Sequence, residues 1–279
     1  MSTLASPVPV ARKAPAFISL QALATLVRRR FTLTARTPRE LIVPLLTPVL
    51  FALVIAPALR NALHTSAAYE AYVATGTLGL LIPLNTMFAG LGVIGDRETG
   101  AQPELLAAPI PRTLLVLANL VVALGVTALQ VGVLIVAALA RGIDFNASAS
   151  GTLWFAAAAT LFAIGMYGIA ETLAARVPRQ EEYISRVPAI AIVPWFLAGS
   201  LFPIVAMPQG LTYFSKLLPL THGLALVRYG LLGDRSGLEN IWGMSSTSMM
   251  AALSLGVVAL FAAVLTAVSI RVFTRSAVR

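Results

Sequence analysis

Few side chains in this sequence could perform chemistry, and cysteine is absent altogether. Its two histidines, His64 and His222, are too few for a histidine metal cluster, and the missing thiols exclude thiolate metal sites and cysteine nucleophiles. Neither of the two lysines, Lys13 and Lys216, follows a glycine, so neither ends the glycine-rich loop with which ATPases hold phosphate. The G-x-S-x-G and H-E-x-x-H patterns are also missing. We therefore expect no enzymatic activity and no bound cofactor on this chain.

One acidic residue, Glu171, lies in sequence typical of a membrane span. An acid in such a place can carry protons or ions, as in a secondary transporter. Alternatively, it lies near the cytoplasmic end of its helix and forms an ion pair with Arg176 or Arg179. We favour the ion pair, because a position near the cytoplasmic end brings Glu171 within reach of these arginines. The sequence also contains no repeated three-helix half, which disfavours a secondary transporter.

The elements that must position these residues follow from the scarcity of charge. Only 11% of the 279 residues are charged, against about 25% in soluble domains. Each of six uncharged stretches is long enough to cross the hydrocarbon core as a helix, which needs about 20 residues. They are residues 41–59, 71–95, 113–140, 145–170, 187–215 and 240–270. Helices satisfy every backbone polar group in lipid, so the sequence predicts an all-α integral membrane protein with six transmembrane helices.

The net charge of +9 reports topology rather than nucleic-acid binding, and we expect no nucleic-acid partner. Fifteen of the 20 Lys and Arg fall in the two terminal tails and in loops 95–112 and 176–186. The remaining five fall on the opposite side of the predicted spans. This bias predicts a multi-pass protein of the plasma (inner) membrane with both termini in the cytoplasm.

Residues 1–40 are interpreted as an uncleaved cytoplasmic tail that contains an amphipathic helix at the membrane surface. Apolar residues at helical spacing form one stripe of this helix: Phe17, Leu20, Ala24, Val27 and Phe31. Arginines cluster at its end: Arg28, Arg29, Arg30 and Arg36. We expect the stripe in the acyl boundary, the arginines on anionic headgroups, and a stop at Thr37 before Pro38. A plain basic tail required by the orientation is the alternative.

Loop 95–112 combines mixed charge with residues that begin and end helices. Pro103 suits the first turn of a helix, Glu104 favours the same end electrostatically, and Pro109 stops the helix about two turns later. The sequence therefore predicts a short stiff helix on the cytoplasmic side, suited to a moving partner. An ordinary connecting loop is the alternative.

A second segment, residues 207–233, contains two apolar pieces separated by Pro219. Each piece is too short to span, so we expect a helical segment that enters the outer leaflet and returns before the last span. His222 and Arg228 lie in the second piece. We favour structural roles for both, as caps or by reaching headgroups, over contacts with a transported substrate.

Both segments resemble the permease subunits of ABC-2 type exporters, and the resemblance covers nearly the whole chain. In that family the first cytoplasmic loop forms the coupling helix, which contacts the ATPase. The matching residues here are Asp96, Arg97, Glu98, Gly100, Leu105, Leu106, Pro109 and Arg112. Ala101 and Pro103 depart from the pattern, and Glu104 is its acid displaced by one position. The resemblance implies that this loop contacts an ATPase, with the paired leucines as apolar knobs for a groove on the partner.

The family also has a Phe-Pro pair, a Pro-Leu-Thr sequence and an arginine in its outer segment. The matching residues here are Phe202, Pro203, Pro219, Thr221 and Arg228. With His222, the Pro-Leu-Thr-His form is similar to the branch of lipo-oligosaccharide and antibiotic-resistance exporters.

The resemblance implies that residues 41–279 form the permease domain of an ATP-driven exporter. Its cargo would be amphipathic, lipid-like, drug-like or a lipo-oligosaccharide. A second identical or related permease would complete the pathway, and two cytoplasmic ABC ATPase subunits would hold the ATP and Mg²⁺. The alternative function is an ion-gradient-driven secondary transporter that uses Glu171.

Overall fold

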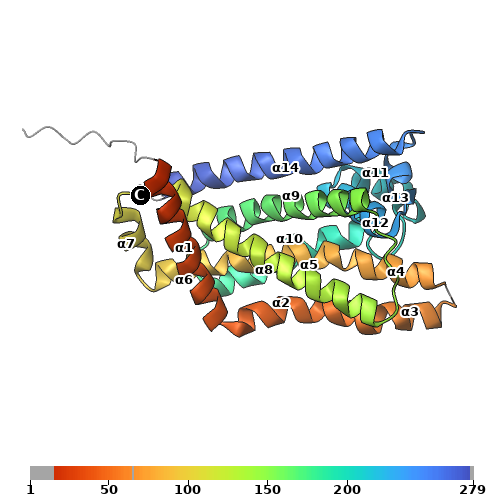
Figure 1. The fold of residues 1–279 in the computed structure, drawn as a ribbon, viewed down its shortest axis with the longest axis horizontal. Helices are drawn as coiled ribbons and strands as arrows, with labels where there is room; N and C mark the ends of the chain where they lie inside the picture. Colours follow the sequence, from red (N-terminus) through yellow and green to blue (C-terminus); the bar gives the residue numbers. More distant parts are fainter. Residues whose placement is uncertain (1–15, 65, 277–279) are drawn as a thin grey trace, which may run out of the picture.

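The computed structural model describes residues 16–64 and 66–276, and every regular element in that part of the chain is a helix. Most helices run along one elongated bundle (Figure 1). In chain order they are α1 (Ala16–Arg36), α2 (Pro38–Leu50), η1 (Phe51–Ile55), α3 (Ala56–Ala62), α4 (Ala67–Gly76), α5 (Leu78–Ala89), α6 (Leu91–Glu98), α7 (Ala101–Ala107), α8 (Thr113–Ala140), α9 (Ala149–Ala174), α10 (Gln180–Leu197), η2 (Ile204–Ala206), α11 (Gln209–Leu217), α12 (Pro219–Leu232), α13 (Ser236–Trp242) and α14 (Thr247–Ser276).

Four helical paths in the described residues are long and apolar enough to cross a membrane. They cover residues 68–98, 113–140, 149–174 and 247–275, and each contains most of one predicted span. The first of them is α4, α5 and α6 in succession, and 78% of its most apolar window is buried, against 22% in α14. The second predicted span is therefore the centre of the bundle. The all-helical membrane fold agrees with the sequence, whereas the count of six spans stays a prediction.

The first predicted span, residues 41–59, lies on α2, the π-helix η1 and α3, which follow one another directly. Residues 48–62 of this path form an apolar helix, which is shorter than the four long ones. Several of its apolar side chains are exposed, among them Ile42, Val43, Leu46 and Val54.

The fifth uncharged stretch, residues 187–215, is not one helix. It begins inside α10, which ends at Leu197, and the chain then turns at Gly199 with φ 79°. After that turn come the short 3₁₀ helix η2 and the helix α11. The left-handed backbone at Gly199 is favourable only for glycine among common residues, so the helix ends there although the sequence stays apolar. At 18 residues α10 is about 27 Å long, close to the thickness of the hydrocarbon core.

The predicted break at Pro219 is confirmed, because α11 ends at Leu217 and α12 starts at Pro219. Proline is favourable at the first helical position, where its missing N–H is no loss. Most of α12 is buried, and it packs against α9, α13 and α14. The protein thus surrounds α12, as a segment of broken backbone in the membrane would require.

Close packing of α9 on α14 completes the core. Gly165 and Gly168 lie on this contact: a Cβ added at Gly168 would lie 2.7 Å from the backbone carbonyl carbon of Leu265. Small residues of this kind let helix backbones approach closely in membranes. The two glycines therefore serve packing within one chain.

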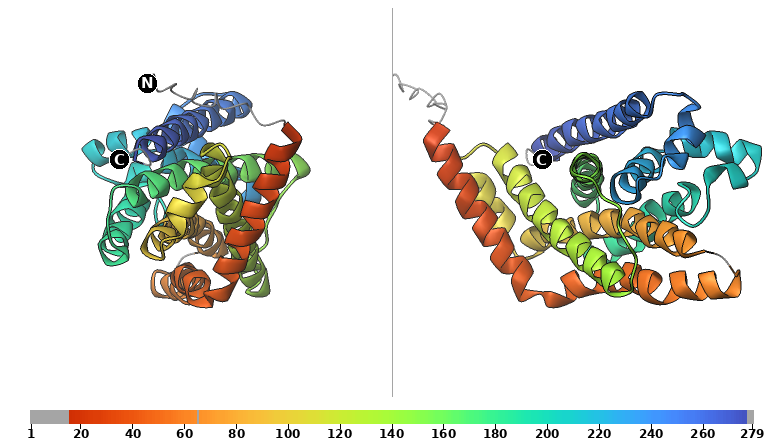
Figure 2. Two further views of the ribbon diagram at one scale, coloured as in Figure 1. Left: turned by 90° about the vertical axis from the view of Figure 1, so that its left-hand side faces the viewer. Right: turned by 45° about the vertical axis from the view of Figure 1, so that its right-hand side comes forward.

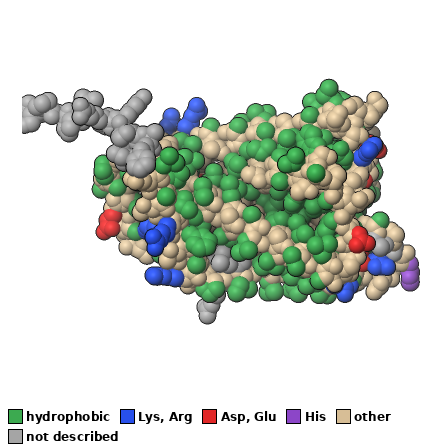
Figure 3. Space-filling view, in the orientation of Figure 1, with side chains coloured by type: hydrophobic (Ala, Val, Ile, Leu, Met, Phe, Trp, Pro, Cys, Tyr) green, Lys and Arg blue, Asp and Glu red, His purple; other side chains and the backbone are tan. Residues whose placement is uncertain are grey.

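The bundle has two ends that differ in their contents. The α7 end carries α1, the α6–α7 turn, residues 175–179 and the last turn of α14, and Figure 2 (left) shows α1 crossing it obliquely. The α3 end carries the α3–α4 turn, α11 and α13. On the face in Figure 3, hydrophobic side chains cover the middle and charged ones lie toward the ends. The described parts of the four segments that the charge bias assigned to one side thus gather at one end.

Candidate functional site

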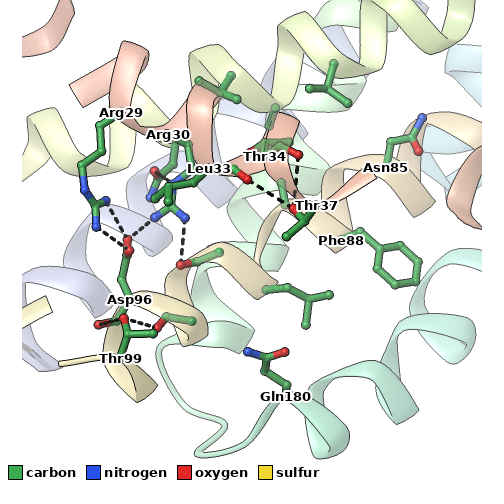
Figure 4. Close-up of a pocket in the computed structure, with 18 of the residues that line it drawn as sticks. Arg29, Arg30, Leu33, Thr34, Thr37, Asn85, Phe88, Asp96, Thr99 and Gln180 are labelled. Carbon is green, nitrogen blue, oxygen red and sulfur yellow. Dashed lines mark hydrogen bonds and ion pairs between the residues drawn. The ribbon is translucent and has the colours of Figure 1, made fainter. Parts of the chain in front are cut away.

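At the α7 end, Asp96 joins α6 to α1 (Figure 4). Its carboxylate accepts a hydrogen bond from Arg29 Nη2 at 2.9 Å and another from Arg30 Nη2. Arg30 also donates to the carbonyl of Gly92 at 2.9 Å and to Oδ1 of Asn119 on α8 at 2.8 Å. We expected Arg29 and Arg30 on anionic headgroups, and that is wrong for the buried Arg30. Arg29 also binds Asp96, but a third of its side chain is exposed, so its contact with headgroups stays a prediction. A single sequence could not indicate this pairing across more than 60 residues.

The rest of α1 fits the predicted surface helix better. Its end at Arg36, one residue before Thr37, is as expected. On the predicted stripe, Leu20 and Phe31 are exposed and Val27 is half-buried. Arg28 is exposed as well, and the side chain of Phe17 lies outside the described ones. The stripe thus faces away from the bundle, and its contact with lipid stays a prediction.

The next two residues of α6 join it to α9 and α10. Arg97 donates to the carbonyls of Ala174 at 3.3 Å, Val177, and Pro178 at 3.2 Å, at and beyond the end of α9. These carbonyls lack helical partners, and a cation at a helix C-terminus is also favoured by the helix dipole. Glu98 accepts from the side chain of Gln180, the first residue of α10, at 2.8 Å. Asp96, Arg97 and Glu98 therefore tie α6 to three other helices.

The predicted short helix in loop 95–112 is α7, seven residues or about two turns long. Gly100 precedes it with φ 77°, a conformation that allows the sharp turn after α6. Gly100, Pro103, Glu104 and Pro109 are among the exposed residues of this loop. Arg112 lies beyond the helix and donates to the carbonyl of Thr274 on α14 at 3.5 Å.

Leu105 and Leu106 do not extend from α7 as free knobs. Both are half-buried and pack against an apolar cluster of this chain that includes Leu115, Val116 and Phe273. They hold α7 on the bundle, so the apolar groove expected on a partner is provided by the protein itself. The part of α7 left for a partner is its exposed face around Glu104.

Glu171 is fully buried on α9, and the expected ion pair is wrong. Its Oε2 accepts a hydrogen bond from Tyr167 Oη at 2.6 Å, and Oε1 has no hydrogen-bond partner in the described residues. Arg176 and Arg179 are exposed and make no ion pair with it. The chain turns after α9, which carries both arginines to the surface.

At the α3 end, Arg228 of α12 is buried and does not reach headgroups. It donates to the carbonyls of Gly199 and Ser200, each at 3.0 Å, and to that of Tyr72 at 3.3 Å. Ser200 lies in the turn that ends α10, so one side chain closes that turn against α4.

His222 is also held by the protein. Its ring nitrogens lie 3.2 Å from Ser254 Oγ on α14 and 2.9 Å from the carbonyl oxygen of Lys216. Trp242 donates to the same serine hydroxyl at 2.8 Å. His222 thus contacts both α14 and the end of α11. Like Arg228, it is enclosed by protein contacts and does not reach a headgroup.

The remaining residues of the outer segment divide into exposed and buried ones. Phe202 and Pro203 are exposed beside the turn after α10. Thr221 is buried, and its hydroxyl has no hydrogen-bond partner in the described residues. Pro203, Thr221 and Arg228 line one small cavity, whereas Phe202 and His222 do not line it.

Sequence reasoning missed a buried ion-pair cluster at the α3 end. Glu70 is buried and accepts a hydrogen bond from Arg60 at 2.8 Å, with Arg141 3.8 Å away. A signal existed, because these charges bound the first, second and third uncharged stretches on the same predicted side. The pairing ties α3, α4 and the end of α8 together.

With this geometry described, the chain can be assigned to a class. The sequence model of the ABC-2 type transporter family matches residues 21–232, and the chain belongs to that family of membrane transport subunits. It is similar to a protein named transport permease ycf38 from Porphyra purpurea, 27% identical over 215 residues, covering 75% of this chain and 74% of the relative. The protein of the same name from Pyropia yezoensis is 23% identical over 215 residues, with the same coverage.

Proposed function

We propose that this chain is the permease subunit of an ATP-driven exporter. It lies in the plasma membrane, with its α7 end in the cytoplasm. One observation carries the proposal: α6 is tied to α1, α9 and α10, and the adjoining α7 exposes Glu104 at its surface. A force applied to α7 therefore acts on three helices at once. This is the arrangement that an external motor requires.

In this mechanism the permease makes and breaks no covalent bonds. ATP and Mg²⁺ bind to separate ABC ATPase subunits, and family members normally work with such partners. The ATPase pushes on α7, and the half-buried Leu105 and Leu106 keep α7 from sliding over the bundle. The contacts of Asp96, Arg97 and Glu98 then pass the push to the membrane helices.

A second permease, identical or related, completes the pathway in this proposal. Many large apolar side chains of α8 and α14 are exposed in the single chain, which leaves surface for a partner and for lipid. The cargo is amphipathic: lipid-like, drug-like or a lipo-oligosaccharide, as the Pro219–His222 sequence favours.

The orientation can be tested directly, because the chain has no cysteine to give background labelling. Single cysteines at the exposed Ser66 and Ser148 of the α3 end should react with an impermeant maleimide on intact cells. Cysteines replacing the exposed Glu104 and Arg179 should react only after permeabilisation. An inverted pattern would refute the cytoplasmic position of α7.

The partner can be tested with the same variants. A cysteine-linked photo-crosslinker in Glu104→Cys should capture an ABC ATPase in native membranes, identified by mass spectrometry. The matched control, Ser148→Cys, carries the same crosslinker at the opposite end and should not capture it. Native mass spectrometry of the purified complex should then count two permeases and two ATPases, whereas a complex without ATPase would contradict the proposal.

A second candidate function rests on Glu171. It is a fully buried acid in a long apolar helix, and one of its oxygens has no hydrogen-bond partner in the described residues. Acids buried in this way can carry protons or ions through a membrane. An ion-gradient-driven secondary transporter would use Glu171 for that purpose, without an ATPase.

A further inference from the structure

A cavity opens at the α7 end between α1, α5, α6 and α8. Its volume is about 310 Å³, within the range of small-molecule binding sites. Figure 4 shows side chains that line it, with Asp96 and the two arginines toward one side and Asn85 toward the other. The contacts that tie α1 to α6 form part of its wall, but they do not account for its far end.

The end near α1 carries one net positive charge. Arg29 and Arg30 both face Asp96, so two cations share a single acid. Each of the three guanidinium nitrogens of Arg30 makes a hydrogen bond, because the side chain also binds Gly92 and Asn119. Among the residues that the structure describes, Arg29 makes hydrogen bonds only to Asp96, through its two terminal nitrogens, and a third of its side chain is exposed. Its remaining N–H groups are available to a further anion.

The far end carries an amide without a partner. Asn85 on α5 is 7% exposed, and neither its Oδ1 nor its Nδ2 has a hydrogen-bond partner in the described residues. Burying an amide without hydrogen bonds is costly, so such a group in a cavity points to a ligand that would satisfy it.

The distance between the two ends follows from helix geometry. Eleven residues separate Asn85 from Asp96, about 16 Å along a helix. On the antiparallel α8, Asn119 lies beside the arginines and Gln130 lines the cavity eleven residues later. Between these polar ends the lining is mostly apolar: Phe88, Leu91, Val122 and Val126.

We propose that this cavity binds an anionic amphiphile. Its negative group lies at Arg29, its apolar chain runs past the lining of α5 and α8, and a neutral hydrogen-bonding group pairs with the amide of Asn85. The site needs no ATPase and no second permease. Ligand binding at this site can therefore be tested independently of the proposed export function.

The test uses full-length purified protein and 12-hydroxydodecanoate, made photoreactive with a diazirine. At about 1.2 Å per bond in an extended chain, its carboxylate and hydroxyl lie roughly 15 Å apart. Cross-links mapped by mass spectrometry should fall on α5, α6 and α8. Unlabelled 12-hydroxydodecanoate should compete better than dodecanoate, which lacks the hydroxyl, and better than 1,12-dodecanediol, which lacks the charge.

Two variants test the two ends of the cavity. Asn85→Leu should weaken competition by 12-hydroxydodecanoate about fivefold and leave that of dodecanoate unchanged, because only the hydroxyl loses its partner. Arg29→Gln should weaken competition by 12-hydroxydodecanoate and by dodecanoate about tenfold, because the charge-assisted bond to their carboxylates is lost. The matched controls are Asn61→Leu and Arg271→Gln, both exposed and outside the cavity.

Three results would overturn the proposal. One is labelling that leaves the cavity residues unmarked, and another is equal binding by Asn85→Leu, Arg29→Gln and their controls. The third is full competition by inorganic phosphate, which would make the ligand a small anion without an apolar chain. Because Arg29 is partly exposed, its variant keeps the test valid even if Asn85→Leu folds poorly. Export by a chain that fails to bind the probe would refute this inference alone.

Discussion

The guanidinium carbon of Arg228 lies 3.4 Å from the centre of the Tyr72 ring. The stacked cation also binds the carbonyls of Gly199 and Ser200. The hydroxyl of Tyr72 donates to the same Gly199 carbonyl at 2.7 Å. Carbonyls at a helix end need outside donors, and here one arginine and one tyrosine supply them. The two residues fix the place where the fifth uncharged stretch stops being a helix.

Replacing Arg228 by Met should destabilise the α3 end strongly. The change removes three hydrogen bonds to carbonyls and the cation on the ring, at a cost of about 3 kcal/mol. Tyr72→Phe keeps the ring and loses one hydrogen bond, at about 1 kcal/mol. Thermal unfolding in detergent should order the melting temperatures as parent, Tyr72→Phe, Arg228→Met. The exposed Arg235→Met is the control, and equal melting of the two arginine variants would contradict the assignment.

Replacing Arg97 by Met should separate ATP hydrolysis from transport. The side chain holds the carbonyls at the end of α9, and its loss leaves α6 free to move without α9. In proteoliposomes with the ATPase, we expect transport per ATP to fall at least tenfold while the complex still assembles. Arg176→Met, an exposed neighbour, should keep the parent ratio. An unchanged ratio in Arg97→Met would remove this residue from the coupling path.

The two faces of α7 should respond differently to substitution. Glu104→Lys changes an exposed charge, so it should lower recovery of the ATPase in pull-downs and leave the melting temperature unchanged. Leu105→Ala with Leu106→Ala should instead destabilise the protein, by about 1–2 kcal/mol for each half-buried leucine. A double leucine variant that melts like the parent but loses the ATPase would restore the leucines as partner contacts.

Replacing Glu171 by Gln should leave ATP-driven transport intact. The amide oxygen of Gln can accept the hydrogen bond of Tyr167, so the local structure is kept while the titratable group is lost. Transport should be measured with ATP and with an imposed proton gradient. Loss of transport in the variant, together with gradient dependence in the parent, would favour the secondary transporter.

The positions of the apolar helices were predictable because lipid excludes charge, so uncharged stretches mark them without any tertiary information. The end of α10 was not, because residues 187–215 remain uncharged while the chain turns at Gly199. A stretch without charged residues identifies a membrane environment, whereas helix ends depend on local backbone conformation. The break at Pro219 was predictable for that same reason, since proline acts locally.

The position of the candidate site along the chain could be predicted, but the side-chain contacts within it could not. Proline and glycine spacing located α7, yet the roles of Leu105 and Leu106 depended on where α14 lies, which no local pattern gives. Likewise, the partners of Arg29 and Arg30 come from a helix more than 60 residues away. Side chains that meet across the bundle require the fold before they can be assigned.

The polar contacts that join different helices lie mainly at the two ends of the bundle. Asp96 and Arg97 secure one end, Glu70 and Arg228 the other, and the helices between them meet mainly through apolar packing. Apolar packing tolerates volume-conserving substitution far better than a buried ion pair tolerates the loss of a partner. Descendants of this chain can therefore diverge in what their middle accommodates while keeping the same polar contacts at both ends.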